Sequence, residues 1–550
     1  MFILHAKKYR KLLAYSIILS LQLNSFAYAA SVVTPDKSQG KNPGVSQAAN
    51  GVQVIDIRLP NAKGLSHNQY TNLQVGREGI IFNNAGQITK TQLAGYINGN
   101  RHLAGDISAR AILNEVTGKV PTSLNGYLEI AGKKADLIIA NPNGIVGSNF
   151  GYINTGRAVL TTGKPFVGPE GDLRGLNVSK GTITIESLGL DAKTADSAEI
   201  YARAAKLNAA IWAQKLNITT GSNEIDYRTG QVAKVLSDED LGVSLDVAAL
   251  GGMYAGQIFL IGTAKGLGVN MEGNMHCLDT DVIVTQNGDI INKGKLGAKG
   301  NVNIATNGRM ENSGIVYGQN KVNLDSSRGI TNKGSIAGVT VDVVAKDGNV
   351  DTSGKVYGKE KIEINSSKAV MNSGTINGGI VDAIAADGNI NNSGTISGHE
   401  KANINSSKAL ANTGLINGGT LAVTARDGNI ETSGEISAKE SLYITSGKAV
   451  MNKGKILGNI VDVTAKDGDI NNGGCVQGQK SIQVESSKAI TNTGTISGGT
   501  MNIAAKGGSL TRHIHPNRGR PGTRSRPGYE CYGSLCKGRK RTERKSRQRY

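Results

Sequence analysis

Apolar and polar positions recur in a regular short repeat from about residue 285 to residue 510. Each copy is centred on a glycine. Asn or Thr stands two residues before it, an aliphatic residue stands two residues after it, and another apolar residue stands four residues before it. Around Gly334 these positions hold Asn332, Ile336 and Ile330. Eleven consecutive copies keep the pattern without an insertion. Their glycines fall at every twentieth position: Gly294, Gly314, Gly334, Gly354, Gly374, Gly394, Gly414, Gly434, Gly454, Gly474 and Gly494.

A unit of this length is too short to bury its own apolar face, so neighbouring units must stack. The apolar positions are separated by even numbers, as in strands, and Gly or Asn-Gly marks the corners. These features predict one turn of a parallel β-helix per unit, with internal aliphatic ladders and a rise of about 4.8 Å per coil. The recurring Asn is expected to form a ladder of side-chain amides. A leucine-rich repeat is the alternative, but its Leu-x-x-Leu-x-Leu framework is absent.

A second period, twice as long, overlies the first. Every other copy carries an Asp-Gly turn, and the copies between carry Ser-Lys-Ala, as at Ser367. The aspartates are Asp347, Asp387, Asp427 and Asp467. The flanking apolar residues also shift by one position, from odd-numbered residues such as Val341 and Val343 to even-numbered ones such as Ile362 and Ile364. Because a shift of one residue turns a side chain to the other face of a strand, alternate coils must turn their corners differently.

Residues 30–275 show no such period. Short runs such as Val52–Ile57 and Ala135–Ala140 are broken by Gly, Asn and Pro, which predicts several short strands joined by turns. Gly181–Glu186 alternates as a half-buried strand does. Only Ser197–Gln214 has a weak helical pattern, and its Ile200-Tyr201 pair favours a strand instead.

The N-terminus has the organisation of a cleaved signal peptide. Residues 7–11 hold four basic side chains, and the largely apolar Leu12–Leu23 follows. Ala27-Tyr28-Ala29 then forms a small-x-small site, so cleavage is expected after Ala29. The apolar stretch is short for a membrane span, although an uncleaved anchor is the alternative. This predicts export through the Sec machinery.

Composition agrees with an exported repeat protein. The 550 residues include 74 Gly and 1 Trp, and aromatics make up 4%, which suits strands and tight turns better than an aromatic-centred core. Apart from two cysteines in the C-terminal tail, the chain has only Cys277 and Cys475, which gives no disulfide framework and fits passage through a pore.

The net charge of +19 is concentrated in a tail. Residues 512–550 carry 13 Lys and Arg against 2 Glu, so the main body gives little support for nucleic-acid binding. The repeat also stops there, because Arg512 and Ile514 replace the expected Asn and Gly. The tail holds 10 Arg against 12 in all preceding residues. We interpret 511–550 as an out-of-frame, disordered end of a longer exoprotein; a basic arm for nucleic acid or another polyanion is the alternative.

Several segments of residues 30–275 carry a family resemblance. They are Ser66–Tyr70, Ala109–Gly118, Ala135–Ile145, Gly151–Thr155 and Leu160–Pro165. With them the region closely resembles the N-terminal secretion domain of filamentous-haemagglutinin-type exoproteins of two-partner secretion. The following repeats are similar to haemagglutinin repeats. The most specific motif is Asn141-Pro142-Asn143-Gly144.

The resemblance implies a right-handed parallel β-helix that folds outside the cell. It also implies a partner, an outer-membrane β-barrel transporter with periplasmic POTRA domains. By the family's pattern the run Asn141 to Gly144 helps to nucleate the secretion domain, and Asn83 and Asn84 stand at the place of a second motif, here without proline. Independently of any family, Asn-Pro-Asn-Gly is a turn sequence. Direct contact with the transporter and indirect support of the fold both remain open for it.

No catalytic constellation is visible. The recurring aspartates lack the Gly-Gly-x-Gly-x-Asp spacing of a calcium-binding β-roll, so a turn role is expected rather than a metal site. In the tail, His513, His515, Cys531 and Cys536 are zinc-ligand types, but their spacing does not match structural zinc sites. His67 is expected to be a structural hydrogen-bonding residue and Trp212 a packing residue. No metal or cofactor is predicted.

The sequence therefore predicts an all-β chain in four parts. They are a signal peptide (1–29), a β-rich secretion and cap domain (30–275), twenty-residue β-helix repeats (276–510) and the basic tail (511–550). The expected function is that of a non-enzymatic, adhesin-like surface or secreted exoprotein of a Gram-negative bacterium, a class associated with virulence, with a host or bacterial surface receptor as a further partner. A truncated contact-dependent inhibition effector without its toxin is the first alternative, and a β-helical carbohydrate-active enzyme is the second.

Overall fold

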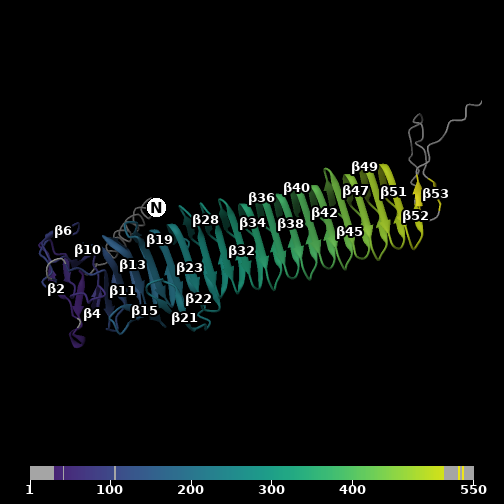
Figure 1. The fold of residues 1–550 in the computed structure, drawn as a ribbon. Helices are drawn as coiled ribbons and strands as arrows, with labels where there is room; N and C mark the ends of the chain where they lie inside the picture. Colours follow the sequence, from purple (N-terminus) through teal and green to yellow (C-terminus); the bar gives the residue numbers. More distant parts are fainter. Residues whose placement is uncertain (1–29, 41, 104–106, 513–529, 533–534, 538–550) are drawn as a thin grey trace, which may run out of the picture.

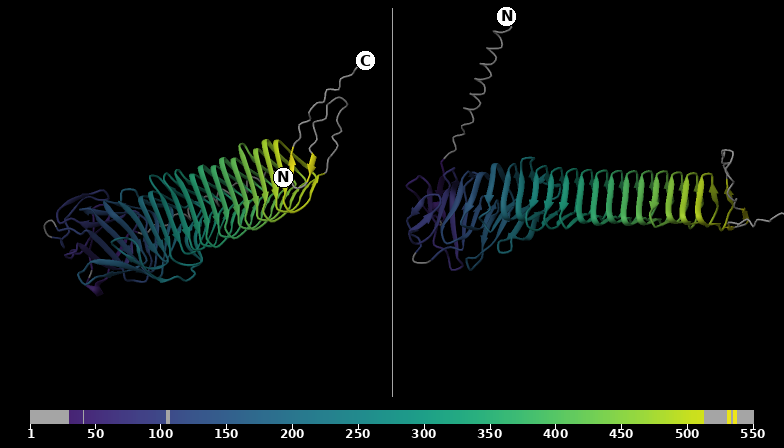
Figure 2. Two further views of the ribbon diagram at one scale, coloured as in Figure 1. Left: turned by 45° about the vertical axis from the view of Figure 1, so that its right-hand side comes forward. Right: turned by 90° about the horizontal axis from the view of Figure 1, so that it is seen from above.

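The computed structural model describes residues 30–40, 42–103, 107–512, 530–532 and 535–537. They form one long β-solenoid whose coils follow one another along a single axis (Figures 1 and 2). Most strands belong to one continuous, largely parallel array, and the described helical content is the 3₁₀ turn η1 (Lys37–Gln39). The prediction of an all-β parallel solenoid is confirmed. The predicted signal peptide, with Ala27 and Ala29, lies outside the described residues.

Each repeat coil contains three strand segments that pair with the equivalent segments of the next coil. In one coil they are β27 (Asp289–Asn292), β28 (Lys295–Ala298) and β29 (Val302–Thr306). In the next they are β30 (Arg309–Asn312), β31 (Ile315–Gly318) and β32 (Lys321–Ser326). Ile290 aligns with Met310 and Leu296 with Val316, and all four side chains are buried. These aligned aliphatic residues form the predicted internal ladders.

The glycine row is required by how closely the corners stack. A Cβ added to Gly334 would lie 2.0 Å from the carbonyl oxygen of Gly314, and the other ten glycines of the row meet the preceding glycine at 1.8–2.1 Å. Such a distance is far inside van der Waals contact. Glycine is therefore required at these positions because a side chain would not fit, and not because the backbone has a positive φ.

The recurring asparagines form the predicted amide ladder inside the corner. Asn372 Nδ2 donates to Asn392 Oδ1 at 2.7 Å, and Asn392 Nδ2 donates to Asn412 Oδ1 at 2.7 Å. Asn412 then donates to Thr432 Oγ1 at 3.2 Å. These side chains are at most 3% exposed, so the ladder satisfies polar groups that water cannot reach.

Alternate coils turn their corners with different numbers of residues, as predicted. Between β34 (Ser335–Ala345) and β36 (Lys355–Ser366), Gly338 pairs with Gly358 but Thr340 pairs with Lys361. The first coil thus has one residue fewer at this corner. It regains that residue at its Asp-Gly turn, where four residues separate the inward Ala345 from Val350, while three separate Ser366 from Val370. This difference in corner length explains why the inward-facing residues are odd-numbered in one kind of coil and even-numbered in the other.

The N-terminal coils share the axis and the core of the repeats. One buried apolar cluster runs from Ile55 to Ala505. Antiparallel pairs cover the first coils: β1 (Val32–Pro35) with β4 (Leu65–Gln74), and β2 (Gly44–Gln47) with β3 (Gln53–Asp56) (Figure 1). Their presence at the end of the solenoid covers an edge that would otherwise offer unpaired backbone groups.

A four-stranded antiparallel sheet lies on the flank of these N-terminal coils (Figure 1). Its strands, in order, are β14 (Lys164–Val167), β15 (Leu173–Val178), β20 (Ser222–Asp226) and β21 (Val232–Ser237). A second apolar cluster under it joins Leu176 and Ile225 of the sheet to Ile138 and Tyr201 of the solenoid. We call it the flanking sheet.

The weak helical pattern of Ser197–Gln214 was misleading. The segment forms β17 (Ser197–Ala202), β18 (Ala204–Leu207) and the start of β19 (Ala210–Thr220). Ile200 is aligned between Leu160 and Ile218 of the neighbouring coils, so parallel pairing overrides local propensity. In the basic tail, the described residues include the short strands β53 (Glu530–Tyr532) and β54 (Leu535–Lys537); most of the region expected to be disordered lies outside the described residues.

Candidate functional site

The Asn-Pro-Asn-Gly motif forms the corner between β11 (Ala135–Ala140) and β12 (Ile145–Ile153). Gly144 N donates to the Asn141 carbonyl at 3.1 Å, which closes a four-residue turn. Gly144 has a φ of 115°, a value that favours glycine, and Asn143 N donates to Asn141 Oδ1 at 2.9 Å. The turn predicted from the sequence is present.

The side chain of Asn141 is fully buried and bonded on both sides. Its Nδ2 donates to Val120 O at 2.9 Å and to Thr122 Oγ1 at 3.0 Å, while its Oδ1 accepts from Asn143 N and Nδ2. The exposed fraction of Asn141 is 0%. In the folded domain the Asn141 amide is therefore not accessible to another protein.

The same turn holds neighbouring coils together. Asn143 Nδ2 donates to Gly118 O at 2.7 Å, and Thr122 N donates to Gly144 O at 3.1 Å, both toward the preceding coil. Toward the following coil, Asn141 N donates to Thr161 O at 2.9 Å. A Cβ on Gly181 would come within 2.8 Å of the Pro142 carbonyl oxygen, so Pro142 is packed against the next corner. The motif thus links three successive coils.

Asn83 and Asn84 end β5 (Ile80–Asn84) and are each 1% exposed. Asn84 Nδ2 donates to the carbonyls of Ala109 and Lys133, and its Oδ1 accepts from Ala109 N at 2.7 Å. Asn83 Nδ2 donates to Asp56 Oδ1 at 2.9 Å. Strand β5 pairs with β3 and β10 (Tyr127–Gly132), not with β11, so the two motifs occupy different strand stacks.

Asn100 belongs with this second motif but was missed from the sequence. Its Nδ2 donates to Ile57 O and to Asn83 O, both at 2.8 Å, and the residue is 1% exposed. Asn100 thus connects the segment between β5 and β8 (Ala111–Val116) to the first coils. Asn98-Gly99-Asn100 has the composition of a turn, but the bonds of Asn100 to Ile57 and Asn83 join residues distant in sequence and cannot be predicted from it.

A buried ion pair that the sequence also did not reveal fastens the flanking sheet to the solenoid. Arg157 Nε and Nη2 donate to the two carboxylate oxygens of Glu199 at 2.9 and 2.6 Å. Arg157 Nη1 donates to Tyr227 O at 2.8 Å, and its guanidinium lies 4.5 Å from the centre of the Tyr227 ring. Tyr227 Oη in turn donates to Asp136 Oδ2 at 2.8 Å. We call this group the Arg157 clamp.

The charges of the clamp depend on one another. Burial alone would raise the pKa of Glu199, but hydrogen bonds and charge from Arg157, with hydrogen bonds from Tyr201 and Ser197, hold that pKa below its ordinary value. Burial opposes the charge of Arg157 as well, and Glu199 outweighs it, so the pKa of Arg157 is raised. Burial raises the pKa of Tyr227, with a smaller contribution from Asp136. The clamp is therefore an ionised pair enclosed by neutral phenols.

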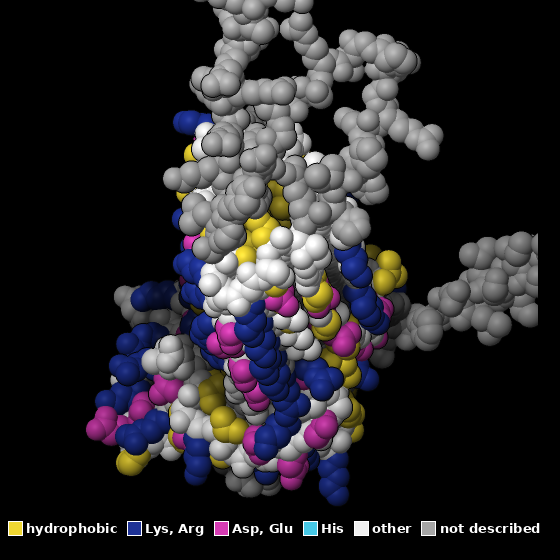
Figure 3. Space-filling view, turned by 90° about the vertical axis from the view of Figure 1, so that its right-hand side faces the viewer, with side chains coloured by type: hydrophobic (Ala, Val, Ile, Leu, Met, Phe, Trp, Pro, Cys, Tyr) yellow, Lys and Arg dark blue, Asp and Glu magenta, His cyan; other side chains and the backbone are white. Residues whose placement is uncertain are grey.

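The recurring aspartates lie on exposed turns, and three of the four pair with a lysine of the next coil. Lys368 Nζ is 3.1 Å from Asp347, Lys408 is 3.5 Å from Asp387, and Lys488 is 3.3 Å from Asp467. Figure 3, which looks at the C-terminal end, shows basic and acidic side chains in rows along the solenoid. Among the described residues, no three His, Cys, Asp or Glu side chains are grouped to hold a metal. The tail histidines His513 and His515 lie outside those residues, and the side chains of Cys531 and Cys536 are not described.

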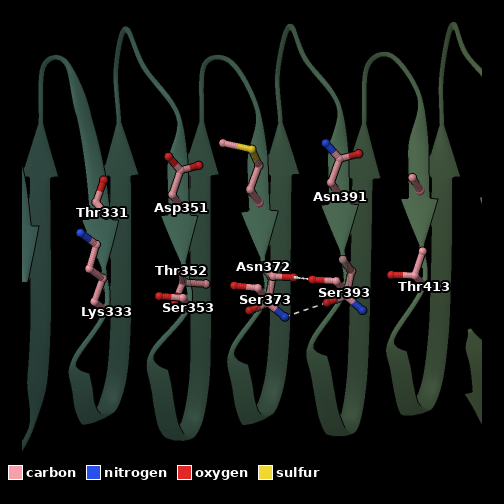
Figure 4. Close-up of a pocket in the computed structure, with 13 residues that line it drawn as sticks. Thr331, Lys333, Asp351, Thr352, Ser353, Asn372, Ser373, Asn391, Ser393 and Thr413 are labelled. Carbon is pink, nitrogen blue, oxygen red and sulfur yellow. Dashed lines mark hydrogen bonds between the residues drawn. The ribbon is translucent and has the colours of Figure 1, made fainter. Parts of the chain in front are cut away.

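A shallow groove of about 450 Å³ runs across several coils on one outer face of the repeats (Figure 4). Small polar residues of successive coils line it, and Asp351, Met371 and Asn391 stand in one row. Burial raises the pKa of Asp351. The residues lining this groove include one carboxylate, Asp351, and one ammonium group, Lys333.

Two further residues can now be placed. His67 Nε2 and Glu115 Oε2 are 2.8 Å apart, which agrees with the hydrogen-bonding role predicted for His67. Trp212 was predicted to pack, and its ring does stack on Tyr254 with centroids 4.3 Å apart. It is nevertheless 40% exposed and lies on the outer surface, not in the core.

The described residues contain no helix of the length and hydrophobicity needed to cross a membrane.

The N-terminal coils are capped by antiparallel strands and share one axis and one apolar core with the repeats. Residues 31–292 match the family model described as the TPS secretion domain. The chain therefore carries a TPS secretion domain, that of two-partner exoproteins. The domain implies a partner transporter in the outer membrane and a secreted or cell-surface location in a Gram-negative bacterium.

Several known proteins are similar to this chain. It is 39% identical over 310 residues to "Toxin CdiA" of Yersinia pestis, an alignment that covers 56% of this chain and 9% of that protein. It is 43% identical over 276 residues to "tRNA nuclease CdiA" of Escherichia coli (strain STEC_O31), covering 50% of this chain and 8% of that protein. The chain thus spans less than a tenth of these curated relatives. The crystal structure of the filamentous hemagglutinin secretion domain is 27% identical, covers 62% of this chain and 98% of that chain, and has a TM-score of 0.41.

Proposed function

We propose that this protein is an adhesin-like exoprotein that a partner transporter carries across the outer membrane. The TPS secretion domain at residues 31–292 is the observation that carries this proposal. In the proposed route, residues 1–29 direct the chain to the Sec machinery, and cleavage follows Ala29. The transporter is a β-barrel whose periplasmic POTRA domains receive the unfolded secretion domain. The repeats from residue 276 onward then form an extended non-enzymatic shaft at the cell surface or in the medium.

Within this function we assign Asn141 to Gly144 a role in folding of the secretion domain. The support for this role is that the buried Asn141 amide donates to Val120 O and Thr122 Oγ1 of the preceding coil. Because the turn links three coils, it can fix the register of the first coils as they form. Asn83 and Asn84, equally buried, are assigned the same role at the preceding cap.

Co-expression with a candidate transporter tests the export proposal. The chain is expected in the medium or on the cell surface only when the transporter is present, and a transporter without POTRA domains should leave it in the periplasm. Export that does not require any outer-membrane transporter would contradict the proposal. N-terminal sequencing of the exported chain checks the predicted cleavage site.

A contact-dependent inhibition effector is the second candidate, because relatives of this region carry the names "Toxin CdiA" and "tRNA nuclease CdiA". Those names describe proteins of which this chain covers 8–9%. A coding segment for a toxin downstream in the same locus would favour this candidate. Growth competition between producing cells and neighbours tests it directly.

A further inference from the structure

One outward-facing position of the solenoid is filled by aromatic side chains. The strand register aligns ten residues of successive coils, namely Tyr127, Gly151, Asp191, Trp212, Tyr254, His276, Gly297, Tyr317, Ala337 and Tyr357. Five of the ten are Tyr or Trp, in a chain with 4% Phe, Trp and Tyr, and His276 adds a sixth ring. Beyond Tyr357 the row continues with Asn377 and Ser397. We call the six ring-bearing members the aromatic ladder.

The ladder lies on the surface and nothing in the described chain covers it. Trp212 is 40% exposed, Tyr317 is 46% exposed and Tyr357 is 49% exposed. Scattered exposed apolar residues are ordinary, but here ring-bearing residues recur in one aligned row, with Trp212, Tyr254 and His276 adjacent in it, which indicates an interaction site. Aromatic residues at such sites supply a large apolar surface with a polar tip.

The spacing within the ladder favours a long ligand with a regular repeat. Tyr317 has Gly297 and Ala337 as its neighbours in the row, and Ala337 alone separates it from Tyr357. The two tyrosines are two coils apart, about 9.6 Å along the axis. That is close to the length of two sugar rings in a linear polysaccharide. The small residue between the tyrosines leaves room for a ring to lie against them.

Lysines flank the same row. Lys355 and Lys359 stand two residues before and after Tyr357 in β36, and Lys295 and Lys299 stand in the same way around Gly297. All four are exposed, and none of them forms an ion pair with a described residue. The two pairs are three coils apart, about 14 Å. The four ammonium groups along this stretch attract a polymer that carries repeated negative charges.

We propose that the aromatic ladder, with these four lysines, is a binding surface for a linear polysaccharide of uronic acids. The sugar rings pack on the tyrosine rings, and the carboxylates face the lysine ammonium groups. The inference deepens the adhesin part of the proposed function and rests on it. Its test uses purified protein, so a failure of binding is distinguishable from a failure of export.

The test measures binding of the full chain to polygalacturonate at physiological salt. The Tyr317→Ser/Tyr357→Ser double variant keeps the net charge and is expected to bind at least about tenfold more weakly, the loss of about 1.4 kcal/mol. The matched control is Tyr443→Ser, because Tyr443 is also 46% exposed but lies in another row, aligned with Ala422 and Asp462. Its affinity should be unchanged. Equal thermal stability of all three proteins shows that they are folded.

Two outcomes would overturn the proposal. One is a double variant that binds polygalacturonate as tightly as the unmodified chain, which would reduce the attraction to net charge alone. The other is equal binding of a neutral linear glucan, which would leave the lysines without a role. The Lys355→Gln/Lys359→Gln variant is expected to weaken binding and to lower its salt dependence.

Discussion

The hydroxyl of Ser406 donates a hydrogen bond of 2.8 Å to the carbonyl oxygen of Gly388 in the preceding coil. Gly388 belongs to an Asp-Gly turn, and Ser406 belongs to the Ser-Lys-Ala type of coil. The same bond recurs in the equivalent pairs Ser366–Gly348, Ser446–Gly428 and Ser486–Gly468. From Asp347 onward the two kinds of coil are therefore complementary, and the structural unit of this part of the solenoid is a pair of coils. In the preceding coils, Thr306 and Ser326 make the same bond in consecutive coils.

Replacing Ser406 by alanine tests this complementarity. The Gly388 carbonyl would lose a buried donor, so Ser406→Ala is expected to lower the free energy of unfolding by about 1–2 kcal/mol. Ser397→Ala is the matched control, since Ser397 is only partly buried and its hydroxyl has no hydrogen-bond partner among the described residues. Denaturant titration compares the two variants, and equal stability would show that the bond contributes nothing.

Replacing Asn141 by alanine is expected to impair export by weakening the secretion domain. The substitution removes both donors to Val120 O and Thr122 Oγ1 and should cost about 2–3 kcal/mol of local stability. Asn177→Ala is the control, because Asn177 is exposed in β15 of the same domain. Secreted protein is measured by immunoblot of the medium, and protease resistance of the purified domain is measured in parallel. Reduced export with unchanged folding would instead support direct recognition.

The glycine row should not tolerate even a methyl group. Gly334→Ala would place a carbon 2.0 Å from Gly314 O, so it should destabilise the solenoid by about 2 kcal/mol or more. Gly473 directly precedes Gly474 of the glycine row, and the atom nearest to a Cβ added to Gly473 would be 3.6 Å away. Gly473→Ala is expected to be neutral or stabilising by about 0.5 kcal/mol. Thermal unfolding of both variants separates close packing from backbone freedom; similar losses would refute the distinction.

Breaking the Arg157 clamp should release the flanking sheet. Arg157→Met leaves Glu199, which is 5% exposed, without its cation, and a loss of about 3–5 kcal/mol is expected. Hydrogen exchange should become faster in β15 and β20 while the repeats stay protected. The Arg157→Met/Glu199→Gln double variant should recover part of the loss, because no buried charge is left unpaired. Unchanged exchange in the sheet would show that the apolar cluster beneath it holds it alone.

Acid should weaken the same clamp. The pKa of Glu199 is lower in the folded protein than its ordinary value of about 4.3. Its contribution to stability is therefore complete above that ordinary value and is lost as the pH falls through the folded pKa. Melting temperatures of the unmodified chain and of Glu199→Gln between pH 7 and pH 3 measure this contribution. The difference should shrink below about pH 4; a constant difference would contradict the assignment.

The repeats could be predicted from sequence because their contacts are periodic. The positions of Ile330, Asn332 and Gly334 recur in every coil, where they hold an apolar residue, Asn or Thr, and Gly. Each position pairs with the same position of the next coil, so the sequence period directly predicts the stacking. The pairing of alternate coils was also visible, through the parity of Val341 and Ile362.

The N-terminal sites were only partly predictable. Asn141 to Gly144 carried a turn signal, but the burial of Asn141 depends on Val120 and Thr122 of another coil. Arg157 and Glu199 are 42 residues apart, and Asn100 bonds to Ile57, so no local pattern reveals these contacts. The aromatic ladder was missed for a related reason. Tyr317 and Tyr357 are 40 residues apart in the regular repeat, but Tyr127, Trp212, Tyr254 and His276 align with them only after coils of unequal length have been stacked.

Complementary coils also limit how such a gene can change its length. Removing a single coil of the Ser-Lys-Ala type would bring two Asp-Gly coils together and leave one glycine carbonyl without its serine donor. Removing or duplicating a complete pair of coils would restore every ladder and every corner contact. Recombination between copies can therefore lengthen or shorten the shaft in whole pairs of coils, about 9.6 Å at a time, without creating a new interface.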